Sequence, residues 1–313
     1  MSVNTSDFSL KKTDIKLIIK SFYELMKPRV MSLVIFTALV GLVISPNKIG
    51  LIDSCFSLFF VAVGAGAAGA LNMWYESEID KVMSRTCLRP LPLGKISTNS
   101  ALLFGIILSV ISVTGLYFFS NLLSAVVLTI TILFYYFVYT VWLKRKTAQN
   151  IVIGGAAGAF PPVIGWTIAT NNISIEPIIL FLIIFFWTPS HFWALSLYKN
   201  EDYKKANIPM LSVIAGEDYT KKNIFIYSII LLPITLLPFA FDFASYMNFF
   251  TVLFFGTSYI YLSYKLLREK DKKNSNFIAN KVFIFSIFYL FFIFSTILSV
   301  SYTHLTLPTN REV

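Results

Sequence analysis

The chain has 313 residues, of which 56% are hydrophobic and only 13% carry a charge. Soluble domains are usually about 25% charged, so this composition excludes an ordinary soluble protein and indicates a polytopic membrane protein. The net charge of +10 does not predict a nucleic-acid partner, because the cytoplasmic loops of membrane proteins are rich in Lys and Arg. Cys55 and Cys87 form neither a disulfide framework nor a metal-binding spacing.

Nine apolar runs along the chain have a length that spans a bilayer. They are residues 30–46, 54–75, 101–119, 122–142, 151–170, 175–198, 223–241, 246–266 and 282–302. With a cytoplasmic N-terminus, alternate connections hold every Lys and Arg except Lys48 and Arg311. This asymmetry obeys the positive-inside rule. The predicted fold is therefore an all-α bundle of nine transmembrane helices with its N-terminus in the cytoplasm.

The domain organisation follows from the same pattern. Residues 1–29 are expected to form a cytoplasmic segment, residues 30–302 a single transmembrane domain, and residues 303–313 a disordered or non-native tail. The first segment lacks a signal peptide and an Arg- and Ser-rich transit peptide, which favours the bacterial inner membrane over a mitochondrial one.

Small residues cluster in two spans, at Gly64–Gly69 and at Gly154–Gly158. Small side chains let membrane helices approach closely, so helix packing is the favoured interpretation. A backbone that lines a substrate cavity is the alternative.

The stretch from Asn72 onward carries the first polar cluster. Asn72, Glu76 and Asp80 recur every four residues, so a helix places them on one face, with Glu78 turned away. An amide and two carboxylates form an oxygen-rich set suited to Mg²⁺, although Mn²⁺ accepts the same ligands. Mg²⁺ is often shared with substrate phosphates, which makes a diphosphate the natural ligand.

Two arginines follow the acidic residues, and Arg side chains bind phosphate oxygens bidentately. Arg85 and Arg89 continue the helical spacing, and Pro90 predicts that the helix ends at Arg89. The alternative is a solvated helix end, whose acids pair with Lys81 and Arg85.

A second polar cluster is expected at the same membrane face. His191 lies in an apolar run near Trp187, and Asp202 follows in a loop with Lys199 and Tyr203. A histidine in such a run is either a polar contact between helices or a ligand of a large flat substrate.

Three runs in these regions carry a family resemblance: KPRVMSLVIFTALVG (27–41), NMWYESEIDKVMSRTCLRPLP (72–92) and WTPSHFWALSLYKNEDYKKANIPML (187–211). They resemble the UbiA superfamily of intramembrane prenyltransferases, and the last two resemble its heme-prenylating branch. The similarity covers roughly residues 20–300. In the first family motif, NxxxDxxxD, Asn72 and Asp80 match and Glu76 takes the middle position; of the second motif, DxxxD, only Asp202 is matched.

The resemblance implies transfer of a farnesyl group from farnesyl diphosphate to heme B. It implies a catalytic and Mg²⁺-binding set of Asn72, Glu76, Asp80 and Asp202. Diphosphate contacts are expected from Lys27, Arg85, Arg89, Lys199 and Tyr203, and heme contacts from Arg29, Trp187 and His191. Besides the two substrates and the lipid bilayer, docking of a downstream heme-modifying enzyme is conceivable.

Two other functions remain open from the sequence. A UbiA-type enzyme acting on a quinone or chlorophyll precursor would keep Asn72, Glu76 and Asp80. A secondary transporter would also have many spans, but its charged residues would lie near the midplane of the membrane.

Overall fold

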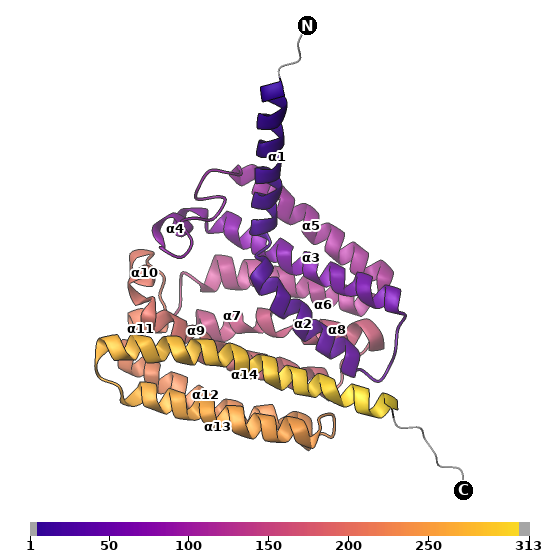
Figure 1. Ribbon diagram of the computed structural model, residues 1–313, viewed down its shortest axis with the longest axis vertical. Helices are drawn as coiled ribbons and strands as arrows, with labels where there is room; N and C mark the ends of the chain where they lie inside the picture. Colours follow the sequence, from indigo (N-terminus) through magenta and orange to yellow (C-terminus); the bar gives the residue numbers. More distant parts are fainter. Residues whose placement is uncertain (1–4, 307–313) are drawn as a thin grey trace.

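The computed structural model of the protein describes the backbone of residues 5–306 and the side chains of residues 15–299. Every regular element in this part of the chain is a helix, which confirms the all-α prediction (Figure 1). In chain order the elements are α1 (Thr5–Leu25), α2 (Pro28–Ile44), α3 (Leu51–Tyr75), α4 (Ser77–Val82), α5 (Thr98–Phe119), α6 (Leu122–Leu133), the π-helix η1 (Phe134–Leu143), α7 (Asn150–Ala159), α8 (Pro161–Thr170), α9 (Ile175–Tyr198), α10 (Asn200–Lys205), α11 (Leu211–Ile214), α12 (Glu217–Ala240), α13 (Tyr246–Arg268) and α14 (Lys272–Thr306).

The helices define a multi-pass membrane protein. Within the described residues, 7 helical segments are long and apolar enough to cross a membrane, and the bent pair formed by α1 and α2 would raise the number to 8. The predicted span at 246–266 coincides with α13, whose tyrosine, serine and threonine residues lower its hydropathy, and α13 is not among these segments. The predicted runs thus coincide with helices, while the number of spans established is smaller than nine.

Three spans depart from a straight α-helix. The chain bends by 49° between α1 and α2. The span at 122–142 changes from the α-helix α6 to the π-helix η1. The span at 151–170 breaks between α7 and α8, where Pro161 and Pro162 occupy the first turn of α8. Proline lacks the N–H that a continuous helix requires, but it fits the first turn of a new one.

The charged connections gather at one end of the bundle, where Figure 1 shows α4, α10 and α11. Lys27 contacts Asn72, and Lys144 pairs with Glu76. Ser84 donates a hydrogen bond to Asp202, and Lys221 donates to the backbone carbonyl of Glu269. These contacts join connections that the loop charges predict to lie on a single membrane face.

The small residues mostly serve close packing, as predicted. A Cβ added to Gly66 would lie 2.6 Å from the Met26 side chain, and one added to Gly154 would lie 2.1 Å from the Tyr139 ring. Gly64 and Ala68 also line an apolar cavity with Leu128 and Pro161, but its volume of about 30 Å³ is too small for a substrate.

The termini extend beyond the bundle. Helix α1 covers most of the 1–29 segment, and its N-terminal part projects beyond the bundle (Figure 1). Its last turns pack on the bundle, where Leu25 is buried and Phe22 contacts Phe104. Helix α14 continues through Thr306, so it includes the first residues of the tail predicted at 303–313. The remainder of that predicted tail lies outside the described residues.

The contact between α2 and α8 gives a test of the packing. A Cβ on Gly165 would lie 1.9 Å from the backbone oxygen of Ala38, which cannot rotate away. We expect Gly165→Ala to separate these helices and to destabilise the protein by about 1–3 kcal/mol, seen as a lower melting temperature in detergent. The matched change Gly158→Ala meets nothing within 4 Å and should leave the melting temperature unaltered. Equal melting of the two variants would contradict the packing described here.

Candidate active site

The structure separates the three predicted polar residues from Glu78, although the helix predicted to carry them breaks at Glu76. Asn72, near the end of α3, Glu76, at the junction of α3 and α4, and Asp80, in α4, are each only 2% exposed. Glu78 points to solvent and forms an exposed ion pair with Lys81 at 2.7 Å. We call Asn72, Glu76 and Asp80 the buried row.

Each member of the buried row contacts a different cation. Lys27 Nζ lies 2.5 Å from Asn72 Oδ1, and Lys144 Nζ lies 2.5 Å from Glu76 Oε1. Arg89 donates from Nη1 to Asp80 Oδ2 at 2.7 Å. We call Lys27, Lys144 and Arg89 the cation trio. The burial of two carboxylates is tolerable here because each has a positive partner.

Irregular backbone brings the cation trio to the row. Lys27 adopts the left-handed conformation, with φ 54°, in the break between α1 and α2. Such a φ is costly for a residue with a Cβ, and here it accompanies the contact of Lys27 with Asn72. Arg89 comes from the loop between α4 and α5, and Lys144 caps the π-helix η1.

The π-helix also orients Asn72. Thr140 Oγ1 in η1 accepts a hydrogen bond from Asn72 Nδ2 at 3.0 Å and donates to the carbonyl of Tyr135 at 2.9 Å. With its nitrogen held by Thr140, the Asn72 amide presents its oxygen to Lys27. The Lys144 backbone N–H bonds to the carbonyl of Tyr139, five residues earlier, so the π register places both Thr140 and Lys144 on the buried row.

One pKa shift follows from this arrangement. At Glu76 burial favours the neutral acid, but the Lys144 ammonium and further cations outweigh it, so the pKa of Glu76 lies below its ordinary value. Glu76 is therefore a carboxylate at neutral pH.

The buried row has the ligand chemistry of a magnesium site. Within the described residues, no three His, Cys, Asp or Glu side chains converge as a metal cluster. Mg²⁺ commonly takes only one or two carboxylates and completes its coordination with water and substrate phosphates. Glu76 and Asp80 therefore fit Mg²⁺ that is shared with a phosphorylated ligand, with the Asn72 amide oxygen beside them.

Arg85 and Arg89 do not lie on one helix, because the helix predicted to carry both of them ends before either. Helix α4 ends at Val82 and Met83 is extended, so Arg85 and Arg89 do not continue the helical spacing. The loop that begins at Met83 folds back and returns Arg89 to Asp80, while Arg85 is exposed. The alternative pairing of the acids with Lys81 and Arg85 holds only for Glu78 with Lys81.

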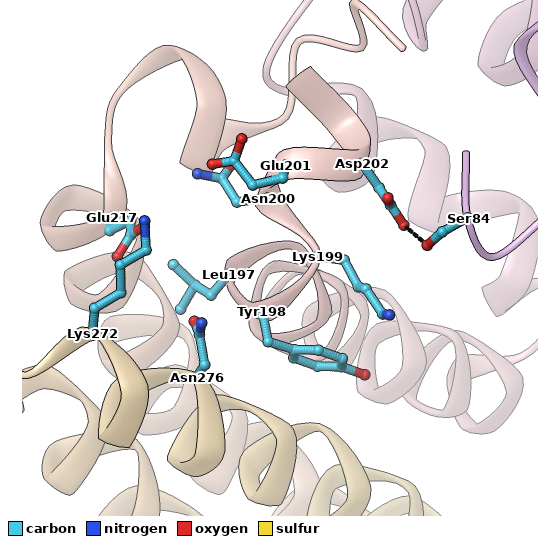
Figure 2. Close-up of a pocket in the computed structure, with 10 residues that line it drawn as sticks. All are labelled: Ser84, Leu197, Tyr198, Lys199, Asn200, Glu201, Asp202, Glu217, Lys272 and Asn276. Carbon is cyan, nitrogen blue, oxygen red and sulfur yellow. Dashed lines mark hydrogen bonds and ion pairs between the residues drawn. The ribbon is translucent and has the colours of Figure 1, made fainter. Parts of the chain in front are cut away.

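Asp202 and Lys199 lie apart from the buried row. They line a polar pocket at the ends of α9, α12 and α14, shown in Figure 2. Asp202 Oδ2 accepts a hydrogen bond of 2.5 Å from Ser84, in the loop that also carries Arg89. This bond joins the two predicted clusters, and the predicted role of Asp202 in metal binding stays a prediction.

Two of the three predicted heme contacts, Trp187 and His191, are buried packing residues in this structure, and the third, Arg29, is exposed. His191 is buried, shares a 2.6 Å hydrogen bond with Ser286 of α14, and stacks between Trp187 and Phe283. Tyr203, which the sequence predicts to contact the diphosphate, is buried in the apolar cluster that includes Met83. Their predicted substrate roles stay predictions.

Sequence reasoning missed Lys144 and Thr140. Lys144 belongs to a run of three basic residues that reads as an ordinary positive-inside loop, and Thr140 is one hydroxyl in an aromatic span. Only the π register, which the residue pattern does not predict, turns both toward α3.

Comparison with known proteins identifies the class. The model of the UbiA prenyltransferase family matches residues 34–295, so the chain belongs to the UbiA prenyltransferase family and is a transferase. A curated relative, the protoheme IX farnesyltransferase of Pelagibacter ubique (strain HTCC1062), is 58% identical over 272 residues, covering 87% of this chain and 90% of that protein.

Solved structures share the fold. A structure of digeranylgeranylglyceryl phosphate synthase has a TM-score of 0.74 at 20% identity, covering 90% of this chain and 99% of that chain. A UbiA homolog from Archaeoglobus fulgidus, bound to DMAPP and Mg²⁺, has a TM-score of 0.65 at 17% identity, with coverages of 90% and 99%.

The pair of Lys144 and Glu76 gives a direct test of the site's electrostatics. Lys144→Met leaves the buried Glu76 carboxylate without its nearest cation, which commonly costs about 3–5 kcal/mol. We expect a clear loss of thermal stability in detergent and partial recovery in Lys144→Arg. The control Lys146→Met, at an exposed position of the same loop, should melt like the unmodified protein. Stability unaffected by Lys144→Met would contradict the pairing.

Proposed function

We propose that this protein transfers the farnesyl group of farnesyl diphosphate to a vinyl group of heme B, which gives heme O and diphosphate. The observation that carries the proposal is the buried row with its cation trio, at one end of a UbiA-type bundle. The 58% identity to a protoheme IX farnesyltransferase supports heme as the acceptor rather than a quinone or chlorophyll precursor.

The cation trio suits a diphosphate leaving group. As the bond between the allylic carbon and oxygen breaks, its electron pair leaves with the diphosphate, whose negative charge grows. Lys27, Lys144 and Arg89 are already oriented by the buried row, so little reorganisation is needed when that charge develops. Preorganised charge of this kind is commonly worth about 3 kcal/mol or more in a transition state.

The buried row would hold the metal through Glu76 and Asp80, with Asn72 beside them. A bound divalent cation supplies charge neutralisation at the diphosphate oxygens. The Archaeoglobus fulgidus homolog, solved with DMAPP and Mg²⁺, supports Mg²⁺, and Mn²⁺ would accept the same oxygen ligands.

The apolar bundle would supply the remaining requirement, which is protection of the allylic cation from water. One vinyl carbon of heme attacks this cation and forms the new carbon–carbon bond. A water molecule then adds to the other vinyl carbon as a hydroxyl group and releases a proton. The farnesyl chain would lie among the apolar spans, where each buried CH₂ contributes about 0.8 kcal/mol to binding.

The membrane arrangement belongs to the same proposal. Nine spans in a bacterial inner membrane, with the N-terminus and the charged end in the cytoplasm, would open the buried row to water-soluble diphosphate. The Lys and Arg distribution supports this orientation. A prenyl chain and a porphyrin would reach the bundle from the bilayer.

An assay of the product tests the proposal. Purified protein with heme B, farnesyl diphosphate and Mg²⁺ should yield heme O, identified by mass. Asn72→Ala and Asp80→Ala should lower turnover by at least about 100-fold, since each removes an oriented polar group of the site.

Glu78→Ala supplies the control, because Glu78 belongs to the same acidic stretch and is 79% exposed. Its turnover should equal that of the unmodified protein. Product with a quinone precursor and none with heme would refute the assignment of the acceptor. Normal turnover in Asp80→Ala, with the protein still folded, would refute the assignment of the site.

A further inference from the structure

Helix α1 has no role in the chemistry derived above, and its last three turns are clearly two-sided. Apolar residues recur at positions i, i+3, i+4, i+7 and i+8, which places them on one face of a helix. They are Ile15, Ile18, Ile19, Phe22 and Tyr23, and we call them the apolar face. Lys16, Lys20 and Glu24 recur every four residues on the other side, where Leu17 is the one apolar residue within 15–24.

The bundle covers only the C-terminal end of the apolar face. Phe22 packs against Phe104 of α5, with ring centroids 4.9 Å apart. Ile15 and Ile19 are 56% and 63% exposed, and Ile18 and Tyr23 are exposed as well. A contiguous apolar surface of this kind marks a contact with an apolar environment.

The apolar face continues the lipid-facing surface of α5. Helix α5 is one of the candidate spans, and its residues Leu103 and Ile107 are 59% and 46% exposed. Phe104 lies between them in the sequence and carries the contact with Phe22. The exposed apolar surfaces of α1 and α5 are therefore joined, and an apolar surface that continues from a membrane span meets the same lipid.

The direction of α1 suits a membrane surface. Figure 1 shows α1 running across the direction of the spans α12 and α14. Because spans cross the membrane, a helix perpendicular to them runs along its surface. Helix α1 ends at the break where Lys27 contacts Asn72, so it lies at the level of the charged end of the bundle. Amphipathic helices in this position place their apolar side chains at the boundary between head groups and acyl chains.

The polar side of α1 indicates which lipid fits. Lys16 and Lys20 are exposed, and among the described residues neither forms an ion pair with a carboxylate. Lysine side chains at a membrane surface extend to the head groups, and anionic lipids attract them. Tyr23 lies at the edge of the apolar face next to this basic side, the position that tyrosine favours at a membrane interface.

The end of α1 controls a residue of the site. The Lys27 backbone N–H donates to the carbonyl of Glu24 at 3.2 Å, so the last turn of α1 holds the left-handed residue that reaches Asn72. Helix α2 begins at once with Pro28. A change in the direction of α1 would therefore move Lys27 relative to the buried row.

We propose that α1 lies in the surface of the cytoplasmic leaflet, with its apolar face among the acyl chains and Lys16 and Lys20 among anionic lipid head groups, and that this contact holds Lys27 in position. The inference rests on the proposed function only for the role of Lys27 in binding diphosphate. It places residues 15–25 of the predicted cytoplasmic segment in the membrane surface.

Spin labels along α1 test the contact with lipid. The cysteines for labelling are introduced into the full chain, after Cys55→Ser and Cys87→Ser, in nanodiscs of phosphatidylcholine and phosphatidylglycerol. Labels at Ile15→Cys and Ile19→Cys should collide with oxygen, which concentrates in lipid, and should be shielded from a water-soluble nickel chelate. Labels at Lys16→Cys and Lys20→Cys should show the reverse.

Access of the nickel chelate to all four labels would overturn the inference, because α1 would then project into water. Shielding of the labels on the apolar face from both reagents would also overturn it, since a partner protein or a second copy of this chain would then cover that face. Neither measurement depends on turnover, so heme O formation by the unmodified protein would leave the proposed function intact in both cases.

The preference for anionic lipid is measured with a fluorophore at Ile19→Cys in the same mixed nanodiscs. Brominated phosphatidylglycerol should quench it more strongly than brominated phosphatidylcholine, with a local enrichment of about fivefold, the scale of one lysine at an anionic surface. Lys16→Gln with Lys20→Gln should abolish the enrichment. The control Lys146→Gln, at an exposed position of another loop, should retain it. Equal quenching by the two lipids in the unmodified chain would overturn the assignment of anionic lipid.

The link to Lys27 is tested by kinetics in the same nanodiscs. Ile15→Ser with Ile19→Ser should raise the KM for farnesyl diphosphate about tenfold, the scale of one charge-assisted hydrogen bond. The same pair of changes should add nothing in a Lys27→Met background. Leu17→Ser, on the other side of α1, should leave the KM unaltered. An unchanged KM in the paired variant, or an equal further rise in the Lys27→Met background, would overturn the link.

Discussion

Charge compensation at the end of α3 is the constraint on which the site depends. Two carboxylates and an amide are almost completely removed from water, and a buried carboxylate without a partner is strongly unfavourable. The cation trio answers this requirement from three separate parts of the chain. The same arrangement leaves positive groups oriented at the place where a leaving diphosphate would need them, so the requirement of stability and that of catalysis coincide.

The irregular features of the fold lie where these cations enter. Lys27 occupies the break between α1 and α2 in a left-handed conformation, Lys144 follows a π-helix, and Arg89 returns from a loop after an early end to α4. Regular helices elsewhere in the bundle pack through glycines against backbone and side chains. Departures from local preference are expected at functional sites, since the surrounding structure must stabilise them.

Local pattern was enough to predict the helices and one face of the site. Apolar runs located the spans, and the period of four separated Asn72, Glu76 and Asp80 from Glu78. The pattern could not identify the partners of these residues, because Lys27 reaches Asn72 across 45 positions and Lys144 depends on the π register. Arg85 and Arg89 look equivalent in the sequence, yet only the backbone turn after Val82 decides which of them reaches Asp80.

The second polar cluster, around His191 and Asp202, also shows that local pattern does not identify the tertiary partners of a residue. Asp202 is expected in a loop and lies in the short helix α10, whereas His191 lies on the predicted span and makes the polar contact between helices that is one of its two interpretations. Asp202 accepts a hydrogen bond from Ser84, and His191 is enclosed between α9 and α14. A polar residue in a membrane span invites a functional interpretation, whereas its hydrogen-bond partner determines which interpretation the structure supports.

The most direct test of the account is the affinity for farnesyl thiodiphosphate, a slowly reacting analogue, measured by calorimetry with Mg²⁺ present. The comparison of Arg89→Met with Arg85→Met is decisive, because both variants lose one guanidinium from the same loop. The account predicts that affinity falls by at least about tenfold in Arg89→Met and is unaltered in Arg85→Met. Equal losses in the two variants, or none in Arg89→Met, would contradict the claim that the buried row and its cation trio form the diphosphate site.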